Sequence, residues 1–167
     1  MPLHRWITPK GLYTPAEKAG IANAITDLYY EQKLLKVSLP RFYVVVYFDE
    51  KEAHDFYHGG RPVTGAGGDG ANFVNIHVEH LARTFSGEAS KKGFMNAYKA
   101  TVEPWIKGRG LDWELLVIDA GDISLWRENG EVPPAAESVE EKIWREKNRV
   151  VVGEELESCA AVMSQKV

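Results

Sequence analysis

Cysteine is almost missing from this sequence, since Cys159 is the only one among 167 residues. A single thiol cannot form an internal disulfide and cannot build a multi-cysteine metal site. This scarcity is typical of a protein from a reducing compartment. Four histidines do not recur at metal-ligand spacing, so zinc is not expected; they are His4, His54, His58 and His77.

Long apolar runs and runs of basic residues are missing as well. Without an apolar stretch we expect neither a signal peptide nor a membrane helix, and we place the protein in the cytoplasm. The formal net charge is -4 and no aromatic residues are interleaved with basic ones, which argues against a general nucleic-acid binder. The composition, 44% hydrophobic and 26% charged, indicates a globular protein of one domain or two small fused halves.

The first fifty residues have the pattern of a strand, a helix and a second strand. Residues 2–8 are strand-like, and Thr14 to Glu17 form a capping box with proline at the first helical position. Apolar residues at helical spacing extend this helix to about Lys33. Residues 41–48 (RFYVVVYF) predict a strand that is too continuous to be half exposed. Residues 2–48 are therefore expected to form a right-handed βαβ unit with parallel strands.

The connector at residues 49–72 is polar and then rich in glycine. A phosphate-binding loop is excluded, because no Gly-Lys-Ser/Thr follows Gly70 and no helix begins directly behind it. Gly59-Gly60 and the later glycines are typical of a hairpin or a flexible connector.

Residues 73–119 repeat the order of elements seen in the first unit. The pattern predicts a strand at 73–79, a helix at 88–106 and a strand at 113–118. Pro104 is expected to kink or shorten the last helical turn. Two βαβ units side by side predict an α/β protein with a four-stranded sheet and two helices.

The remaining residues divide into a loop at 120–134 and a C-terminal helical arm and tail at 135–167. Asn129-Gly130 is a turn signal. Residues 137–150 predict a charged helix whose apolar stripe is too narrow for a core helix. The arm is expected to lie across a neighbouring subunit or to be solvated.

Pro2 is the first candidate for chemistry. Methionine is usually trimmed from ahead of such a residue, which would leave Pro2 with a free secondary amine. An α-amino group titrates at roughly 7.7–8.0, and burial or a nearby cation lowers that pKa. Pro2 could then be a general base or a nucleophile. On this dipeptide alone the alternative is a Met-Pro start without any chemistry.

Four stretches resemble the tautomerase superfamily, and within it the branch of cis-3-chloroacrylic acid dehalogenase and its fungal-type homologues. They are the first helix from Leu12 to Asp27, the glycines of the hairpin, His80-Leu81-Ala82-Arg83, and Leu125 to Pro134 (LWRENGEVPP). The resemblance covers residues 1–134, which we take as one tautomerase-like domain, and leaves the arm uncovered. It implies the tautomerase fold and a homotrimer in which neighbouring subunits complete each site.

The resemblance assigns roles to three residues. Pro2 matches the N-terminal proline that acts as base or acid, and Arg83 matches an arginine that clamps the substrate carboxylate. Glu128 aligns with the carboxylate that activates water. From the residues alone, Arg83 could instead solvate the loop before the second helix, and Glu128 could solvate a turn.

Three positions depart from the resembling enzymes. His80 replaces a first arginine, and as a pH-dependent partner for an anion it could equally be an ordinary loop histidine. Tyr29 replaces a histidine at the helix end, and a water-activating tyrosine falls near Val117. We therefore expect a cofactor-independent isomerase, a tautomerase acting on small keto/enol or unsaturated carboxylic acids, with Tyr29 and His80 binding substrate. Dehalogenation is not expected, and the alternatives are a catalytically silent oligomeric binding module or a weak dehalogenase or hydratase.

Overall fold

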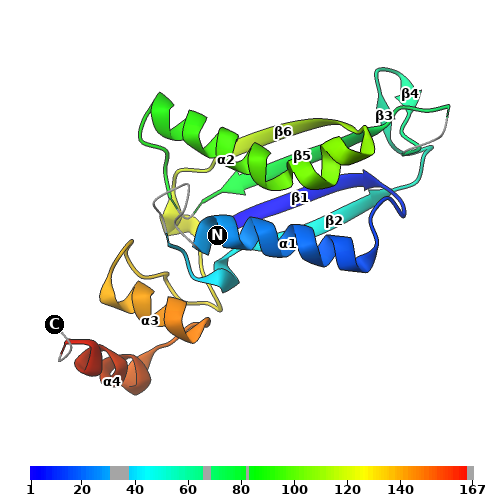
Figure 1. Ribbon diagram of the computed structural model, residues 1–167. Helices are drawn as coiled ribbons and strands as arrows, with labels where there is room; N and C mark the ends of the chain where they lie inside the picture. The colour runs from blue at the N-terminus through cyan, green and yellow to red at the C-terminus, as the bar shows by residue number, and fades with distance from the viewer. Residues whose placement is uncertain (31–37, 66–68, 82, 165–167) are drawn as a thin grey trace.

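A computed structural model describes residues 1–30, 38–65, 69–81 and 83–164. Its centre is a four-stranded sheet with the order β2-β1-β5-β6, formed by β2 (Val45–Lys51), β1 (Pro2–Pro9), β5 (Phe73–His80) and β6 (Asp112–Asp119) (Figure 1). The pairs β1–β2 and β5–β6 are parallel. The two central strands, β1 and β5, are antiparallel. The predicted pair of βαβ units is confirmed.

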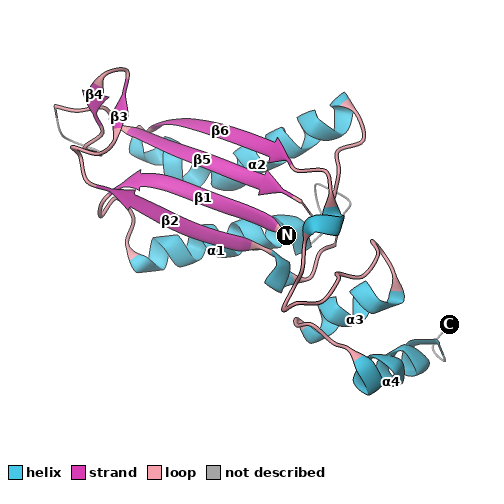
Figure 2. Ribbon diagram, turned by 180° about the vertical axis from the view of Figure 1, so that it is seen from behind, coloured by secondary structure: helices cyan, strands magenta, loops and turns pink. Residues whose placement is uncertain are grey.

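Helices α1 (Pro15–Tyr30) and α2 (Glu88–Ile106) cover one face of this sheet, and Figure 2 shows both behind the strands. The predicted capping box is present, since the Thr14 amide donates to Glu17 at 2.8 Å. The bounds of α2 are those predicted, with Pro104 inside it and a 3-10 turn (Lys107–Arg109) after it. The end predicted for α1 at Lys33 lies outside the described residues. Fully buried core side chains come from both layers: Trp6, Ile21, Ile25, Ile76, Tyr98 and Val102.

The connector between the two units contains a small hairpin. Strands β3 (Tyr57–His58) and β4 (Arg61–Pro62) pair antiparallel. Between them Gly59 and Gly60 have φ angles of 58° and 77°, which glycine adopts without steric cost. The hairpin predicted here is confirmed.

The strand predicted at 41–48 was placed wrongly. Residues Arg41–Tyr43 form a 3-10 turn behind Pro40, with the Tyr43 amide donating to the Pro40 carbonyl at 3.1 Å, and β2 begins at Val45. The expectation that this strand is too apolar to be half exposed was also wrong. Strand β2 is an edge strand whose residues are exposed or half-buried, because no helix of the described ranges covers the second face of the sheet (Figure 2).

The C-terminal arm consists of α3 (Val139–Lys147) and α4 (Gly153–Ser164). Ile143 and Trp144 of α3 are buried within the same chain, where Trp144 packs against Phe42 and Tyr43. The prediction of a solvated arm was wrong for this face, because the narrow stripe of α3 lies on aromatic residues of the turn before β2. The arm therefore belongs to the same packed structure as the sheet.

The second face of the sheet is uncovered (Figure 2). Val45, Leu116 and Ile118 are 37%, 43% and 48% exposed. Along β6, Leu116 and Ile118 alternate with the half-buried Leu115 and Val117. Among the described residues, no helix is long and apolar enough to cross a membrane.

Candidate active site

The candidate side chains gather at the edge of the sheet where strands β1, β5 and β6 begin or end, because of the topology of the sheet. The amino end of β1 lies beside the carboxyl end of β5, so Pro2 pairs with His80. On the other side of β5, His80 pairs with Asp119 at the end of β6. Pro2 and His80 are both buried. Two residues separated by 78 positions in sequence are thereby held on neighbouring strands.

The α-amino group of Met1, directly ahead of Pro2, lies in an unusual electrostatic environment. Its pKa is lowered to about 4, chiefly because burial disfavours the ammonium form. Glu128 opposes this change and Arg83 adds to it, so both charges act on the chain terminus. An amine in this environment is neutral at pH 7 and can accept a proton.

Glu128 is held by the turn that the sequence predicted. Its amide donates to the Glu131 carbonyl at 2.9 Å, and Asn129 and Gly130 between them have φ angles of 51° and 87°. This two-residue hairpin uses the asparagine-glycine pair that tolerates positive φ. The Glu128 side chain is half-buried.

His80 is 3% exposed and surrounded by aromatic rings. It stacks on Phe85 with centroids 4.6 Å apart, and its Nδ1 lies 3.5 Å from the Tyr29 hydroxyl. Burial is the main cause that lowers the pKa of His80 to about 4. At pH 7 His80 is therefore a neutral imidazole that offers a hydrogen bond and no charge.

Tyr29 lies behind His80 and does not line the pocket at this edge. It is fully buried, and burial raises the pKa of its phenol well above the usual value. His4 contacts the same ring edge-on, and its Nδ1 lies 3.0 Å from the Tyr98 hydroxyl. Tyr29 is placed to orient His80 through its hydroxyl.

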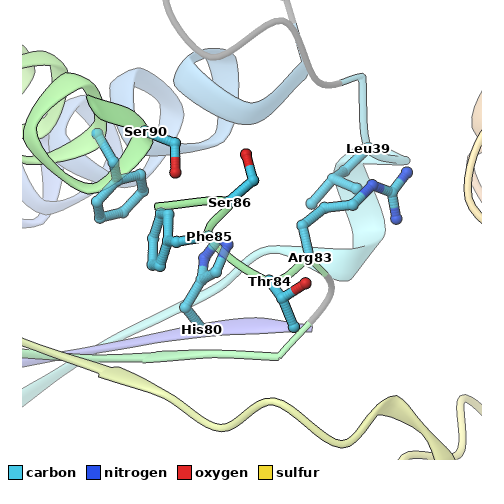
Figure 3. A pocket seen from close by; sticks show the side chains of 8 residues that line it. Leu39, His80, Arg83, Thr84, Phe85, Ser86 and Ser90 are labelled. Atoms are coloured by element: carbon cyan, nitrogen blue, oxygen red, sulfur yellow. The ribbon is translucent and has the colours of Figure 1, made fainter. Parts of the chain in front are cut away.

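A pocket of about 160 Å³ opens at this edge (Figure 3). His80 lies at its base, Arg83 and Leu39 lie on one side, and Phe85 lies on the other. A second pocket of about 500 Å³ meets the first at Arg83. Apart from Arg83 its lining is mostly apolar and comes from the loops after β5 and β6: Leu81, Ile123, Val132, Pro133, Pro134, Ala135 and Ala136. A small molecule with an apolar body could thus lie beside the guanidinium.

Arg83 is bound by the C-terminal arm. Its Nη2 donates to both carboxylate oxygens of Glu141, at 3.0 and 2.8 Å, and lies 3.7 Å from Glu137. The Arg83 and Glu141 side chains are 16% and 3% exposed. The guanidinium assigned to the substrate thus has a carboxylate partner within its own chain.

Of the five predicted site residues, His80 and Arg83 line one pocket, Pro2 pairs with His80, and Glu128 acts with Arg83 on the chain terminus, whereas Tyr29 lies one layer deeper. Pro2 and Glu128 are not among the residues that line either pocket. Sequence reasoning missed Glu141. Ser138 and Glu141 have the spacing of a capping box, and the Glu141 amide does donate to the Ser138 hydroxyl at 3.1 Å. That signal locates the start of α3 but does not indicate Arg83 as the partner of the side chain.

Tyr43 is a second residue that sequence reasoning missed. It is 1% exposed, and its hydroxyl has no hydrogen-bond partner in the described structure. Burial raises the pKa of its phenol, with further contributions from Glu141 and Glu128.

In the described part of the chain, no group of three or more histidine, cysteine, aspartate or glutamate side chains is arranged to hold a metal ion.

Comparison with known proteins identifies the family. The family model Tautomerase_3, described as "Putative oxalocrotonate tautomerase enzyme", matches residues 1–149. The chain belongs to this family of the tautomerase superfamily, as its sequence motifs indicated. No curated protein sequence matches it significantly.

Solved structures with a similar fold agree with the assignment of the chain to this family. Native RhCC from Rhodococcus jostii RHA1 is 34% identical, with a TM-score of 0.80 over 90% of this chain and 99% of that one. A protein from the thermophilic fungus Aspergillus fumigatus, described as "a probable enzyme", is 36% identical, with a TM-score of 0.79 over 92% and 98%. N1, a member of the cis-3-chloroacrylic acid dehalogenase family, shares the fold at 18% identity and a TM-score of 0.64, over 87% and 97%.

Proposed function

We propose that this protein is a cofactor-independent tautomerase acting on small keto/enol carboxylic acids. In this mechanism Met1 is removed and Pro2 carries a free secondary amine. The neutral amine takes a proton from the substrate, and the protonated ring returns it to carbon at the other end of the conjugated system. No oxidant or reductant is needed, because the reaction only moves one proton and the π electrons.

Arg83 and His80 are the substrate-binding groups of this proposal. Arg83 attracts the carboxylate and the negative charge that develops when the proton leaves, which is the electrostatic part of catalysis. His80 donates a hydrogen bond as a neutral imidazole, and the Tyr29 hydroxyl, 3.5 Å from its Nδ1, orients the ring. The apolar pocket beside Arg83 suits an aryl or alkyl group on the substrate.

The observation that supports this proposal is the position of Pro2, which is buried at the head of β1 and pairs with His80, while His80 and Arg83 line the same pocket. The direct test is enol-to-keto conversion of an arylpyruvate, followed by absorbance, on protein whose mass shows that Met1 is absent. Conversion clearly above the buffer rate is expected. An inactive, folded and trimmed protein would instead favour a silent tautomerase-fold module.

Hydrolytic dehalogenation is expected to be absent or very slow. It requires a water molecule that is held and deprotonated, and Glu128 is the one retained residue of the resembling apparatus. Tyr29 is buried behind His80, and Val117 has no polar group. Each missing helper could cost about 10²–10⁴-fold in rate. Chloride release from cis-3-chloroacrylate, measured beside the tautomerase assay, checks this expectation, and rapid release would contradict it.

A trimer is the expected assembly. A single copy leaves β2 and β6 as edge strands and one sheet face uncovered, with Leu116 and Ile118 about half exposed. A fused 4-OT of this fold, 21% identical with a TM-score of 0.56, is described as a symmetric trimer. Light scattering at micromolar concentration should report three copies, and Leu116→Lys should dissociate them. A stable wild-type monomer would count against shared sites.

A further inference from the structure

Glu141 is a buried carboxylate beside the pocket, and both of its oxygens accept hydrogen bonds. Its Oε2 accepts from the Glu137 amide at 2.7 Å as well as from Arg83 at 2.8 Å, and its Oε1 accepts from Arg83 at 3.0 Å. The side chain is 3% exposed, so little water screens its charge. The first turn of α3 fixes its position through Ser138, the helix cap.

Negative charges dominate the surroundings of the pocket. Arg83 is flanked by Glu141 and, at 3.7 Å, by Glu137. Glu128 acts on the chain terminus from the other side. His80 adds no positive charge at neutral pH, since burial lowers its pKa to about 4. Because Glu141 already balances much of the charge of Arg83, the guanidinium has little charge left to offset a second ligand carboxylate.

We propose that Glu141 is a specificity-determining residue that limits the negative charge of the ligand to one. A monocarboxylate with an apolar body is accepted, and a dicarboxylate of the same shape is rejected. The proposal rests on the proposed function for the identity of the site as a binding site for enolisable acids. Glu141 acts through Arg83 and through its own field, without touching the ligand.

The physical reason is that Coulomb energy scales with the charge of the ligand. Removing one fixed negative charge near the pocket favours a dianion more than a monoanion, by up to twice the free energy if both ligand carboxylates lie at the same distance from it. An uncharged ligand should be unaffected. A merely structural role for Glu141 would instead weaken all three ligands alike. The charge-dependent pattern and the uniform one are distinct whatever the absolute affinities are.

The experiment measures binding by calorimetry, with three non-reacting ligands of one shape. They are methyl 3-phenylpropanoate, 3-phenylpropanoate and 4-(2-carboxyethyl)benzoate, which carry no, one and two negative charges. With Glu141→Gln we expect unchanged binding, about tenfold tighter binding and still tighter binding, up to about a hundredfold, respectively. Glu137→Gln is the matched control, since this side chain is 58% exposed and its charge is screened by water, so small changes are expected.

Equal changes for all three ligands, or weaker binding of the anions, would overturn the proposal. If Glu141→Gln fails to fold, the wild-type protein still provides a test. The wild-type protein should bind the monocarboxylate more tightly than the dicarboxylate of the same shape; equal or tighter binding of the dicarboxylate would also overturn the proposal. Binding of these ligands needs no proton transfer. A protein without tautomerase activity that still shows the expected dependence on ligand charge would refute the proposed reaction and leave the role of Glu141 standing.

Discussion

Tautomerisation by the trimmed protein is expected to fall by about 10²–10⁴-fold when Pro2 is replaced by alanine, the range associated with losing a positioned acid–base group. The pyrrolidine ring of Pro2 fixes the nitrogen relative to β1, and the pairing of Pro2 with His80 fixes β1 relative to the pocket. Alanine would leave a primary amine that rotates freely. Measurement of kcat/KM for an arylpyruvate enol checks the effect.

Retention of Met1 is the matched control for this experiment. In that form the Pro2 nitrogen is part of a peptide bond and has no basic lone pair, so proton abstraction by Pro2 is impossible. We expect the residual rate to equal that of buffer. Undiminished activity in protein whose intact mass includes Met1 would remove Pro2 from the mechanism.

The pH dependence of the same reaction has a definite direction. Burial lowers the pKa of the Met1 amine to about 4, and a buried amine is neutral above its lowered pKa and gains a proton as the pH falls through it. Pro2 is buried as well, so in the trimmed protein we expect the acid limb of kcat/KM below the roughly 7.7–8.0 of an ordinary α-amino group. A limb near pH 8 would indicate an amine in contact with water, and would argue against the buried terminus as the base.

Local patterns predicted most of the fold. The apolar spacing of α2 and the capping box of α1 are contained in short segments, so their bounds or starting residues follow from the sequence. The prediction of a strand directly after Pro40 was wrong because the structure there depends on residues distant in sequence. The first three residues of that segment form a turn that packs under Trp126 and Trp144, which come from much later in the chain. Such a contact overrides the local preference of Arg41–Tyr43 for a strand.

The site was predictable only where a resemblance supplied the roles. Nothing in the spacing of Pro2 and His80 indicates that β1 and β5 are antiparallel neighbours, because this pairing depends on how the two βαβ units meet. The Arg83–Glu141 pair joins positions 58 residues apart, and Glu141 reads as an ordinary member of a charged helix. Its burial against Arg83 distinguishes it from the other acidic residues of α3, and burial is a property of the assembled chain.

Arg83→Ala is expected to destabilise the protein as well as to weaken substrate binding. The substitution leaves Glu141, 3% exposed, without its cation. Removing one partner of a buried ion pair costs about 3–5 kcal/mol. For a chain of this size that corresponds to a decrease of about 6–20 °C in the melting temperature. Thermal unfolding followed by circular dichroism measures it.

Two further variants separate the buried charge from the loss of a long side chain. Arg83→Ala with Glu141→Ala should be more stable than Arg83→Ala alone, because no unpaired charge then remains buried. Arg149→Ala, which breaks the half-exposed pair with Glu155, should cost at most about 1 kcal/mol. If Arg83→Ala is as mild as Arg149→Ala, the Arg83–Glu141 pair does not hold α3 against the site. Glu141 would then not compete with the substrate for the guanidinium. The kinetic effect of Arg83→Ala could in that case be attributed to the loss of substrate binding.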